Sequence, residues 1–95
     1  MSKFKTININ ELSKISDPAV IDIRENNEVA MGMVPGAKHI PMMGLMLNPD
    51  NFLNKDTMYY IYCAGGGRSM QVCNQLSLAG YQVVNLDGGY NGYRR

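Results

Sequence analysis

The amino-acid sequence predicts one α/β domain with a mainly parallel sheet. Runs of β-branched and aromatic residues alternate along it with segments whose apolar residues recur at helical spacing. The connections between these segments are short and contain glycine, proline and asparagine, as is usual between strands and helices. With 95 residues the chain can form one hydrophobic core but not two, so we expect a single domain over residues 1–95.

The net charge and the number of cysteines limit the classes of function that this chain can have. Nine Lys and Arg residues against eight Asp and Glu residues give a net charge of +1, without a long basic run to follow a phosphate backbone or an anionic membrane. We therefore expect no nucleic acid and no membrane among the partners. The N-terminal segment lacks the apolar run of a signal peptide, and two cysteines are too few for a disulfide framework. A soluble cytoplasmic protein with reduced thiols is expected.

The first expected element is a short helix that begins after Asn8. Asn8 is followed three residues later by Glu11, a spacing that resembles a capping box at a helix N-terminus. Ile9, Leu12 and Ile15 then recur at helical spacing and would form the buried face of this helix.

Four short elements are expected in the middle of the chain. Residues 19–23 form a β-branched run after an Asp-Pro pair, which is typical of a buried strand. Residues 25–31 are expected to be helical, and residues 39–41 to form a very short strand. Residues 42–47 are expected to form one or two helical turns, which end at residues 48–50 because these contain asparagine and proline.

The C-terminal part of the chain has the clearest signals. Residues 58–62 are aromatic and β-branched and predict a strand, which a glycine loop follows directly. A helix is expected from Ser69 onward, with Gly80 at the position of a C-terminal cap. One face of this helix carries Val72, Cys73, Leu76 and Ala79. Residues 83–86 predict a last strand, and residues 87–89 a turn that ends it.

The glycine loop after residues 58–62 is the expected functional site. Ligands of open α/β sheets bind at the carboxyl ends of the strands, and Cys63 lies at such an end. The residues that follow it are Ala64, Gly65, Gly66, Gly67 and Arg68. Glycines can adopt backbone angles that turn successive N–H groups inward, and the next helix adds the positive end of its dipole. Such surroundings lower a cysteine pKa from about 8.5 to roughly 3.5–7.5, so we predict a thiolate nucleophile at Cys63 with residues 64–68 as its substrate-binding loop.

Two other interpretations of this loop remain open. Cys63 could be a small apolar residue that ends a buried strand, which is the common role of a lone cysteine. The loop could also bind an anion without catalysing a reaction. Three consecutive glycines and an arginine directly after the cysteine favour the functional interpretation, because a core cysteine requires none of them.

Four segments resemble rhodanese-like domains, and they occur in the order of that family. Cys63 and Arg68, separated by four residues, with Ser69 opening a helix, resemble its active loop. The other segments resemble its Asp-x-Arg strand end, its Gly-His-Ile-Pro-Gly-Ala turn and its closing turn; they are residues 22–24, 32–37 and 86–89. Met33 departs from the pattern where His is usual, and Tyr93 stands where Trp is frequent.

The resemblance implies a five-stranded, mainly parallel sheet flanked by helices, and a sulfurtransferase of the thiosulfate or persulfide type. Cys63 would take sulfane sulfur from a small-molecule donor as a persulfide and pass it to a thiol or protein acceptor, without a metal or an organic cofactor. The loop N–H groups would stabilise the persulfide, while Arg68 would fix the loop and add positive charge.

Two alternative functions use the same loop. One is a persulfide carrier or docking module with negligible turnover of its own. The other is a cysteine phosphatase or arsenate reductase, which also joins a cysteine to an arginine by an anion-binding loop. The loop here is one residue shorter than the common phosphatase signature, which suits a single sulfur atom better than a tetrahedral oxyanion.

Several residues outside the loop are expected to be structural. Cys73 shares a helical face with apolar residues and should point into the core. Asp22 and Arg24 could pair with each other or with Glu28 to hold the scaffold beneath the loop. His39 follows a Pro-Gly turn and suits a scaffold position better than a general base.

The methionines of the middle segment are the remaining feature of note. They are Met31, Met33, Met42, Met43 and Met46. Thioethers together with a thiolate could bind copper(I), but these residues lack a repeated metal-binding spacing. Methionine more often fills apolar gaps or lines an adaptable docking surface, so we assign no metal.

Overall fold

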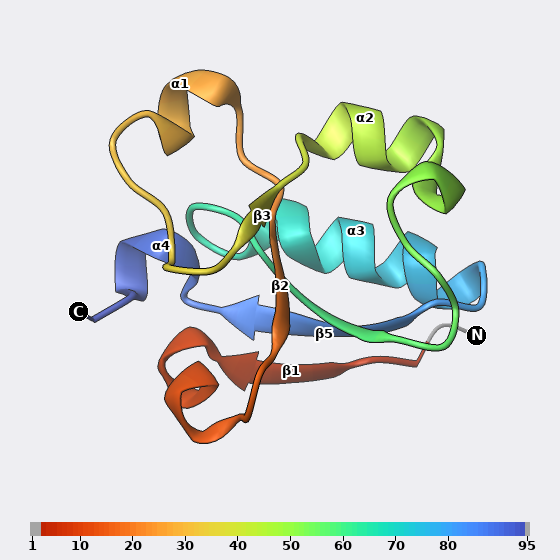
Figure 1. Cartoon of the computed structure of the whole chain (residues 1–95), viewed down its shortest axis with the longest axis horizontal. Helices are drawn as coiled ribbons and strands as arrows, with labels where there is room; N and C mark the ends of the chain where they lie inside the picture. Colours follow the sequence, from red (N-terminus) through yellow and green to blue (C-terminus); the bar gives the residue numbers. More distant parts are fainter. Residues whose placement is uncertain (1–2, 95) are drawn as a thin grey trace.

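Five parallel strands form the central sheet of the computed structural model, which describes residues 3–94 (Figure 1). The strands are β1 (Lys5–Asn8), β2 (Ala19–Asp22), β3 (Lys38–His39), β4 (Met58–Tyr62) and β5 (Gln82–Asp87). Their order across the sheet is β1-β5-β4-β2-β3, and each neighbouring pair is parallel. This arrangement confirms the predicted α/β class with a parallel sheet.

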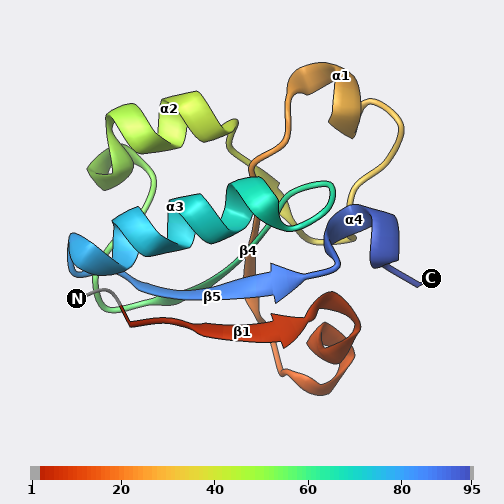
Figure 2. The same ribbon diagram turned by 180° about the vertical axis from the view of Figure 1, so that it is seen from behind.

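Helical segments lie between the strands and after the last strand. Two of them are the 3-10 helices η1 (Ile9–Lys14) and η2 (Pro49–Asn51), and the others are the α-helices α1 (Asn26–Val29), α2 (Met42–Leu47), α3 (Gly67–Leu78) and α4 (Gly89–Gly92). The views from both sides place α2 and α3 on the same side of the sheet (Figure 2). Within residues 3–94, no helix has the length and apolar character needed to cross a membrane.

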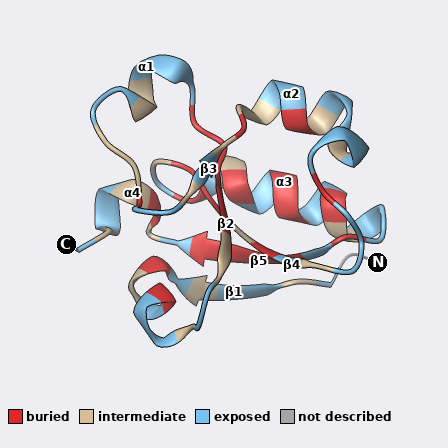
Figure 3. Ribbon diagram, viewed as in Figure 1, coloured by how far each residue is buried: buried red, intermediate tan, exposed pale blue. Residues whose placement is uncertain are grey.

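Two apolar layers cover the sheet, one on each face. On one face, α2 and α3 pack against Tyr59 and Ile61 of β4. On the other face, η1 packs with Tyr60 and Tyr62 of the same strand. The alternation follows from the two-residue period of a strand, which sends successive side chains to opposite faces. Buried residues accordingly follow the central strands and the inner face of α3 (Figure 3).

The sequence of β1 lacks the kind of residue pattern that predicts the other strands. Three of the four residues of β1 are exposed and only Ile7 is half-buried. The reason is its place at an edge of the sheet, where it pairs with β5 alone. A polar edge strand of this kind carries little of the apolar pattern that identifies buried strands.

The segment after β1 is helical as expected, but it is a six-residue 3-10 helix that ends at Lys14. The side chain of Asn8 accepts a hydrogen bond from the N–H of Asn10 at 2.9 Å, so the capping contact differs from the expected box with Glu11. A capping box occurs instead at α1, between Glu25 and Glu28.

The remaining boundaries differ by a few residues from the predicted ones. The α1 helix is confined to Asn26–Val29, and the β3 strand to Lys38–His39. The α3 helix begins at Gly67, two residues before Ser69, because Gly66 has a φ of +114° and forms its N-terminal cap. Gly80 has a φ of +96°, as expected for a glycine just beyond a helix C-terminus.

Because β4 is the middle strand of the sheet, the loop after it lies at the centre of the row formed by the carboxyl ends of the strands. From β2 the chain passes outward to β3, returns to β4, and then continues to β5 on the other side. The β2–β4 pair is therefore the point at which the winding of the sheet changes direction, where open α/β sheets form their binding sites. Cys63 is the first residue after β4 at this point.

Candidate active site

Cys63 lies at the carboxyl end of β4 and is 1% exposed. Its Sγ accepts hydrogen bonds from the N–H of Gly66 at 3.1 Å and from the N–H of Ser69 at 3.4 Å. The Oγ of Ser69 lies 3.5 Å from the same sulfur. The loop thus folds back so that the sulfur faces the N–H groups at the start of α3, which favour a negative charge.

Two opposing effects act on the pKa of the Cys63 thiol. Burial raises the pKa, because a thiolate is poorly stabilised away from water. The hydroxyl and N–H of Ser69 and the N–H groups of Gly66 and Gly65 lower it by hydrogen bonding to the charged form. The hydrogen bonds outweigh burial, so the pKa lies below the ordinary value for cysteine. The site is therefore suited to hold a sulfur anion.

Of the three loop glycines, only Gly66 has a positive φ. A Cβ at this position would be strained and would lie 3.5 Å from the Oδ1 of Asp87. A Cβ at Gly65 or Gly67 would meet nothing within 4 Å. Gly66 is therefore the glycine that the loop conformation requires, while its two neighbours leave the outer side of the loop without side chains.

Arg68 connects the loop to α1. Its two terminal nitrogens donate to the two carboxylate oxygens of Glu28, at 2.8 Å each. The pairing lowers the pKa of Glu28 to about 2 and raises that of Arg68. Arg68 thus ties the start of α3 to α1, and its charge is already paired. The sequence also allowed an ion pair of Glu28 with the Asp22–Arg24 pair, but the carboxylate of Glu28 pairs with Arg68 instead.

A buried polar network lies at the ends of β2 and β4. The Nη2 of Arg24 donates to the Oδ2 of Asp22 at 2.8 Å and to the carbonyl of Gly32 at 2.7 Å. The hydroxyl of Tyr62 donates to the same Asp22 oxygen at 2.6 Å and accepts from the N–H of Val34 at 3.0 Å. These contacts join β2, β4 and the turn before β3, so Asp22 and Arg24 act as scaffold residues.

The start of α4 closes the loop from the other side. The N–H of Tyr90 donates to the carbonyl of Cys63 at 2.9 Å, and the N–H of Asn91 donates to that of Ala64 at 3.0 Å. This approach requires glycine at position 89, where φ is +56° and a Cβ would lie under 3.0 Å from both carbonyl oxygens. The turn that ends the last strand is thus a direct support of the Cys63 loop.

The other thiol and the single histidine have structural positions. Cys73 is fully buried in the layer between α3 and the sheet, and burial raises its pKa to about 12. The Nε2 of His39 lies 2.7 Å from the carbonyl oxygen of Arg24. In the described structure, neither side chain forms a hydrogen bond with the Cys63 sulfur.

The methionines of the middle segment differ in how far they are buried. Among residues 3–94, no three His, Cys, Asp or Glu side chains are grouped so that they could hold a metal ion. Met42 and Met46 pack partly against the core, whereas Met31 and Met43 are exposed. Their positions fit gap filling and surface exposure.

The sequence does not predict two of the site residues near the sulfur, Ser69 and Asn85. Ser69 presents both its N–H and its hydroxyl to Cys63. Asn85 of β5 accepts a hydrogen bond from the Ser69 hydroxyl at 2.6 Å and is fully buried. The one available signal for Asn85 is its polarity within the otherwise apolar run of residues 83–86.

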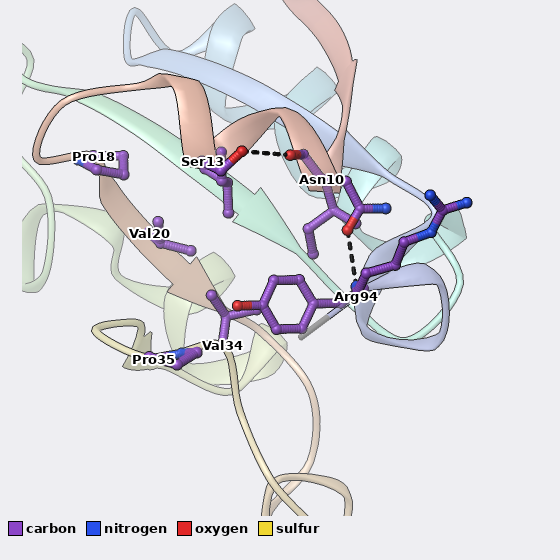
Figure 4. A pocket seen from close by; sticks show the side chains of 10 residues that line it. Asn10, Ser13, Pro18, Val20, Val34, Pro35 and Arg94 are labelled. Carbon is purple, nitrogen blue, oxygen red and sulfur yellow. Dashed lines mark hydrogen bonds between the residues drawn. The ribbon is translucent and has the colours of Figure 1, made fainter.

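A separate hollow of about 390 Å³ lies between η1 and the end of the chain (Figure 4). Its sides include Val20, Val34 and Tyr93, and Arg94 donates from its N–H to the Oδ1 of Asn10 at 2.8 Å at its margin. No residue of the Cys63 loop lines it. The hydrogen-bonding geometry, rather than this hollow, identifies the candidate active site.

Comparisons with known proteins agree with the fold. The family model for the rhodanese-like domain matches residues 8–95. A putative sulfurtransferase of Bacillus subtilis, YtwF, is 46% identical over 70 residues, which cover 74% of this chain and 67% of that protein. A sulfurtransferase of Allochromatium vinosum is 38% identical over 85 residues, covering 88% of this chain and 78% of that protein.

A solved structure extends the similarity to three dimensions. The crystal structure of a rhodanese-like domain protein from Staphylococcus aureus superposes with a TM-score of 0.84 at 37% sequence identity. The superposition covers 96% of this chain and 92% of that one. The five-stranded parallel architecture is therefore shared along almost the whole length of both chains.

Proposed function

The chain belongs to the rhodanese-like domain family, and from this premise we propose that it is a sulfurtransferase that carries sulfane sulfur as a persulfide on Cys63. The observation that carries the proposal is the arrangement of N–H groups from Gly66 and Ser69 around the Cys63 sulfur. These donors hold the pKa of the thiol below its ordinary value despite burial. A thiolate can thus form at Cys63 without a separate general base.

The proposed reaction has two displacement steps. In the first, the Cys63 thiolate attacks the outer sulfur of a donor persulfide, the S–S bond of the donor breaks, and the donor leaves as a thiolate. Cys63 then carries a persulfide. In the second, an acceptor thiolate attacks the outer sulfur, the Cys63 S–S bond breaks, and the Cys63 thiolate is restored. One sulfur atom moves, and no net oxidation or reduction occurs.

The residues of the loop have distinct proposed roles. Ala64, Gly65, Gly66 and Gly67 form the substrate-binding surface around the sulfur, and Gly66 also donates its N–H to it. Arg68 holds the loop in place through its pair with Glu28. Its positive charge contributes to the field at Cys63, although that pair reduces the contribution.

The proposed substrates and partners follow from this chemistry. The donor is a small molecule with a sulfane sulfur, either a persulfide or thiosulfate, and the acceptor is a thiol or a protein. We propose a cytoplasmic setting, where thiols remain reduced, and no role for nucleic acid, a membrane, a metal or an organic cofactor. The 95 residues act as a single domain in this proposal.

The test combines mass spectrometry with steady-state kinetics. After treatment with glutathione persulfide, the protein is expected to gain one sulfur atom on the peptide that contains Cys63. The Cys63→Ser variant is expected to gain none, while Cys73→Ser is expected to remain active. Repeated turnover with a thiol acceptor distinguishes an enzyme from a persulfide carrier, which would load once and transfer slowly.

A phosphatase assay tests the other alternative. The loop between Cys63 and Arg68 is expected to be too small to seat three phosphoryl oxygens, so aryl phosphates should not be hydrolysed. Saturable hydrolysis that disappears in Cys63→Ser would favour a cysteine phosphatase or arsenate reductase over a sulfurtransferase.

A further inference from the structure

Among the described residues, only one of the two polar atoms of the Asn85 side chain has a hydrogen-bond partner. Asn85 is fully buried on β5, and its Oδ1 accepts from the Ser69 hydroxyl at 2.6 Å. Its Nδ2 has no hydrogen-bond partner among the described residues. A buried amide N–H₂ without a partner is unfavourable, and an apolar residue of similar size would avoid this penalty. The presence of asparagine at this position therefore needs a reason.

The Ser69 hydroxyl links Asn85 to the candidate nucleophile. A hydroxyl has one proton to donate, and the Ser69 Oγ lies within reach of three acceptors: the Oδ1 of Asn85, the carbonyl of Gly66 at 3.1 Å, and the Cys63 sulfur at 3.5 Å. In the thiol form, the S–H of Cys63 donates to Ser69 and Ser69 donates to Asn85. All three residues then form one directed chain of hydrogen bonds.

Loss of the Cys63 proton favours the opposite donor and acceptor directions in these hydrogen bonds. A thiolate or a persulfide anion is an acceptor, so the Ser69 hydroxyl is drawn to donate to the sulfur. The lone pairs of the Ser69 oxygen would then face those of the Asn85 Oδ1 across the same 2.6 Å. A half-turn of the amide places Nδ2 opposite Ser69, where it donates to the oxygen and gains the partner that it otherwise lacks.

We propose that Asn85 is a positioning residue whose amide rotates to reverse the hydrogen-bond chain through Ser69 when Cys63 becomes an anion. Asparagine suits this role because its amide has an acceptor and a donor at the same distance from the backbone. With this reversal, the Ser69 hydroxyl supports the sulfur in both forms. The inference rests on the proposed function only in that Cys63 acts as a thiolate.

A change at Asn85 leaves the charged and titratable groups around Cys63 in place. Arg68 and Cys73 of α3 interact electrostatically with Cys63, and Glu28 of α1 pairs with Arg68. Asp22 and Arg24 lie at the end of β2 on one side of β4, and Asp87 lies at the end of β5 on the other side. An apolar substitution at Asn85 adds no charge to this set. A resulting shift in the pKa of Cys63 therefore reports on the hydrogen-bond chain.

The experiment compares the wild type with Asn85→Leu and measures the pKa of Cys63 from the pH dependence of iodoacetamide alkylation. In the wild type, ionisation of Cys63 removes the hydrogen bond from the Ser69 hydroxyl to the Oδ1 of Asn85. A hydrogen bond from the Nδ2 of Asn85 to the Ser69 oxygen replaces it. In Asn85→Leu nothing replaces it, so the pKa is expected to rise by roughly 0.5–1 unit, the worth of one hydrogen bond. In a Ser69→Ala background, the same substitution at Asn85 is expected to leave the pKa unchanged.

The sign of the shift decides between the possible roles. An amide fixed with Oδ1 toward Ser69 would favour the thiol, so its removal would lower the pKa and overturn the proposal. An unchanged pKa would mean that Asn85 only fills space, which also overturns it. Leu86→Ala, a neighbouring buried change on the opposite face of β5, is expected to reduce stability without shifting the pKa.

A measurement on the wild type covers the case in which Asn85→Leu fails to fold. The NMR signals of the Asn85 side-chain amide are expected to shift with the same midpoint as the titration of Cys63, and signals that do not follow it would overturn the proposal. Neither readout needs a sulfur donor. A protein that shows these shifts but transfers no sulfur would contradict the proposed function alone.

Discussion

At the residue scale, the surroundings of Cys63 supply hydrogen bonds but little unpaired positive charge. Its sulfur accepts from the N–H groups of Gly66 and Ser69, and the nearby guanidinium of Arg68 is paired with Glu28. Ala64 and the glycines offer no cation. The site is therefore better equipped to stabilise a singly charged sulfur than to bind a dianion.

This charge distribution predicts a preference among donors. Thiosulfate is a dianion and leaves sulfite with its charge, so we expect it to be a weaker donor than glutathione persulfide. One missing charge contact corresponds to roughly 1–3 kcal/mol, or about one to two decades in kcat/KM. Introducing a cation with Ala64→Lys should improve turnover of thiosulfate more than turnover of the persulfide.

The check is kcat/KM for both donors in the parent and in Ala64→Lys, at low and high salt. Salt should reduce the gain with thiosulfate, because the lysine lies on a half-exposed position. Ala64→Gln is the matched uncharged control. A parent that prefers thiosulfate, or a variant that improves both donors equally, would contradict this view of the loop.

At the scale of elements, three segments converge on the loop after β4. The α3 helix directs N–H groups at the sulfur, α1 holds Arg68 through Glu28, and α4 donates two N–H groups to the carbonyls of Cys63 and Ala64. The loop itself is glycine-rich and would be mobile alone. Its shape depends on contacts with elements that are distant in the sequence.

The contact with α4 predicts a strong effect of Gly89→Ala. The added Cβ would lie under 3.0 Å from the carbonyl oxygens of Cys63 and Ala64, at a φ that disfavours side chains. Either α4 or the loop must move, so we expect a loss of stability of about 2 kcal/mol or more together with reduced sulfur loading. Urea unfolding and mass spectrometry measure the two effects.

Gly92→Ala is the matched control for this change. Gly92 lies in the same short helix, but a Cβ there meets nothing within 4 Å. We expect its stability to stay within about 0.5 kcal/mol of the wild type. Equal effects of the two substitutions would show that the close approach of α4 is not what supports the loop.

The link between α1 and α3 predicts a pH dependence of stability. The pKa of Glu28 falls from 4.5 to about 2 on folding, so its contribution is present above pH 4.5 and disappears as the pH falls through about 2. Both side chains are partly exposed, which limits the pair to about 1 kcal/mol. The free energy of unfolding of Glu28→Gln should therefore lie below that of the wild type at pH 6 and converge with it near pH 2. A difference independent of pH would rule out the ion pair as its cause.

At the scale of the whole molecule, β4 is the structural centre of the fold. It lies between β5 and β2, presents Tyr59 and Ile61 to one apolar layer and Tyr60 and Tyr62 to the other, and is followed directly by Cys63. The hydroxyl of Tyr62 also joins the buried pair of Asp22 and Arg24 to the backbone of Val34. Removing this hydroxyl should therefore affect the stability of the entire domain.

For Tyr62→Phe we expect a loss of about 1–3 kcal/mol in the free energy of unfolding, because a buried carboxylate and a buried N–H each lose a partner. Tyr60→Phe, on the same face of the same strand, is expected to cost at most about 0.5 kcal/mol. Denaturant unfolding of both variants checks this. A small loss for Tyr62→Phe would mean that water or another group replaces the hydroxyl.

The parts of this protein that the sequence determines by itself are those with local causes. The aromatic run of Met58–Tyr62 predicts the central strand because such residues suit a buried pleated surface. The glycines after Cys63 and at Gly80 mark turns because they allow backbone angles that other residues avoid. The candidate nucleophile, the loop and the parallel α/β class all follow from signals of this kind.

Only the tertiary structure decides which distant groups meet at the loop. Glu28 reaches Arg68 across 40 residues of sequence, and Asn85 reaches Ser69 only because β5 lies beside β4. The polar edge strand β1 likewise becomes a strand through pairing with β5. Strand order and helix packing create such contacts, and these arise from the burial of the whole apolar core rather than from the conformational preference of any one segment.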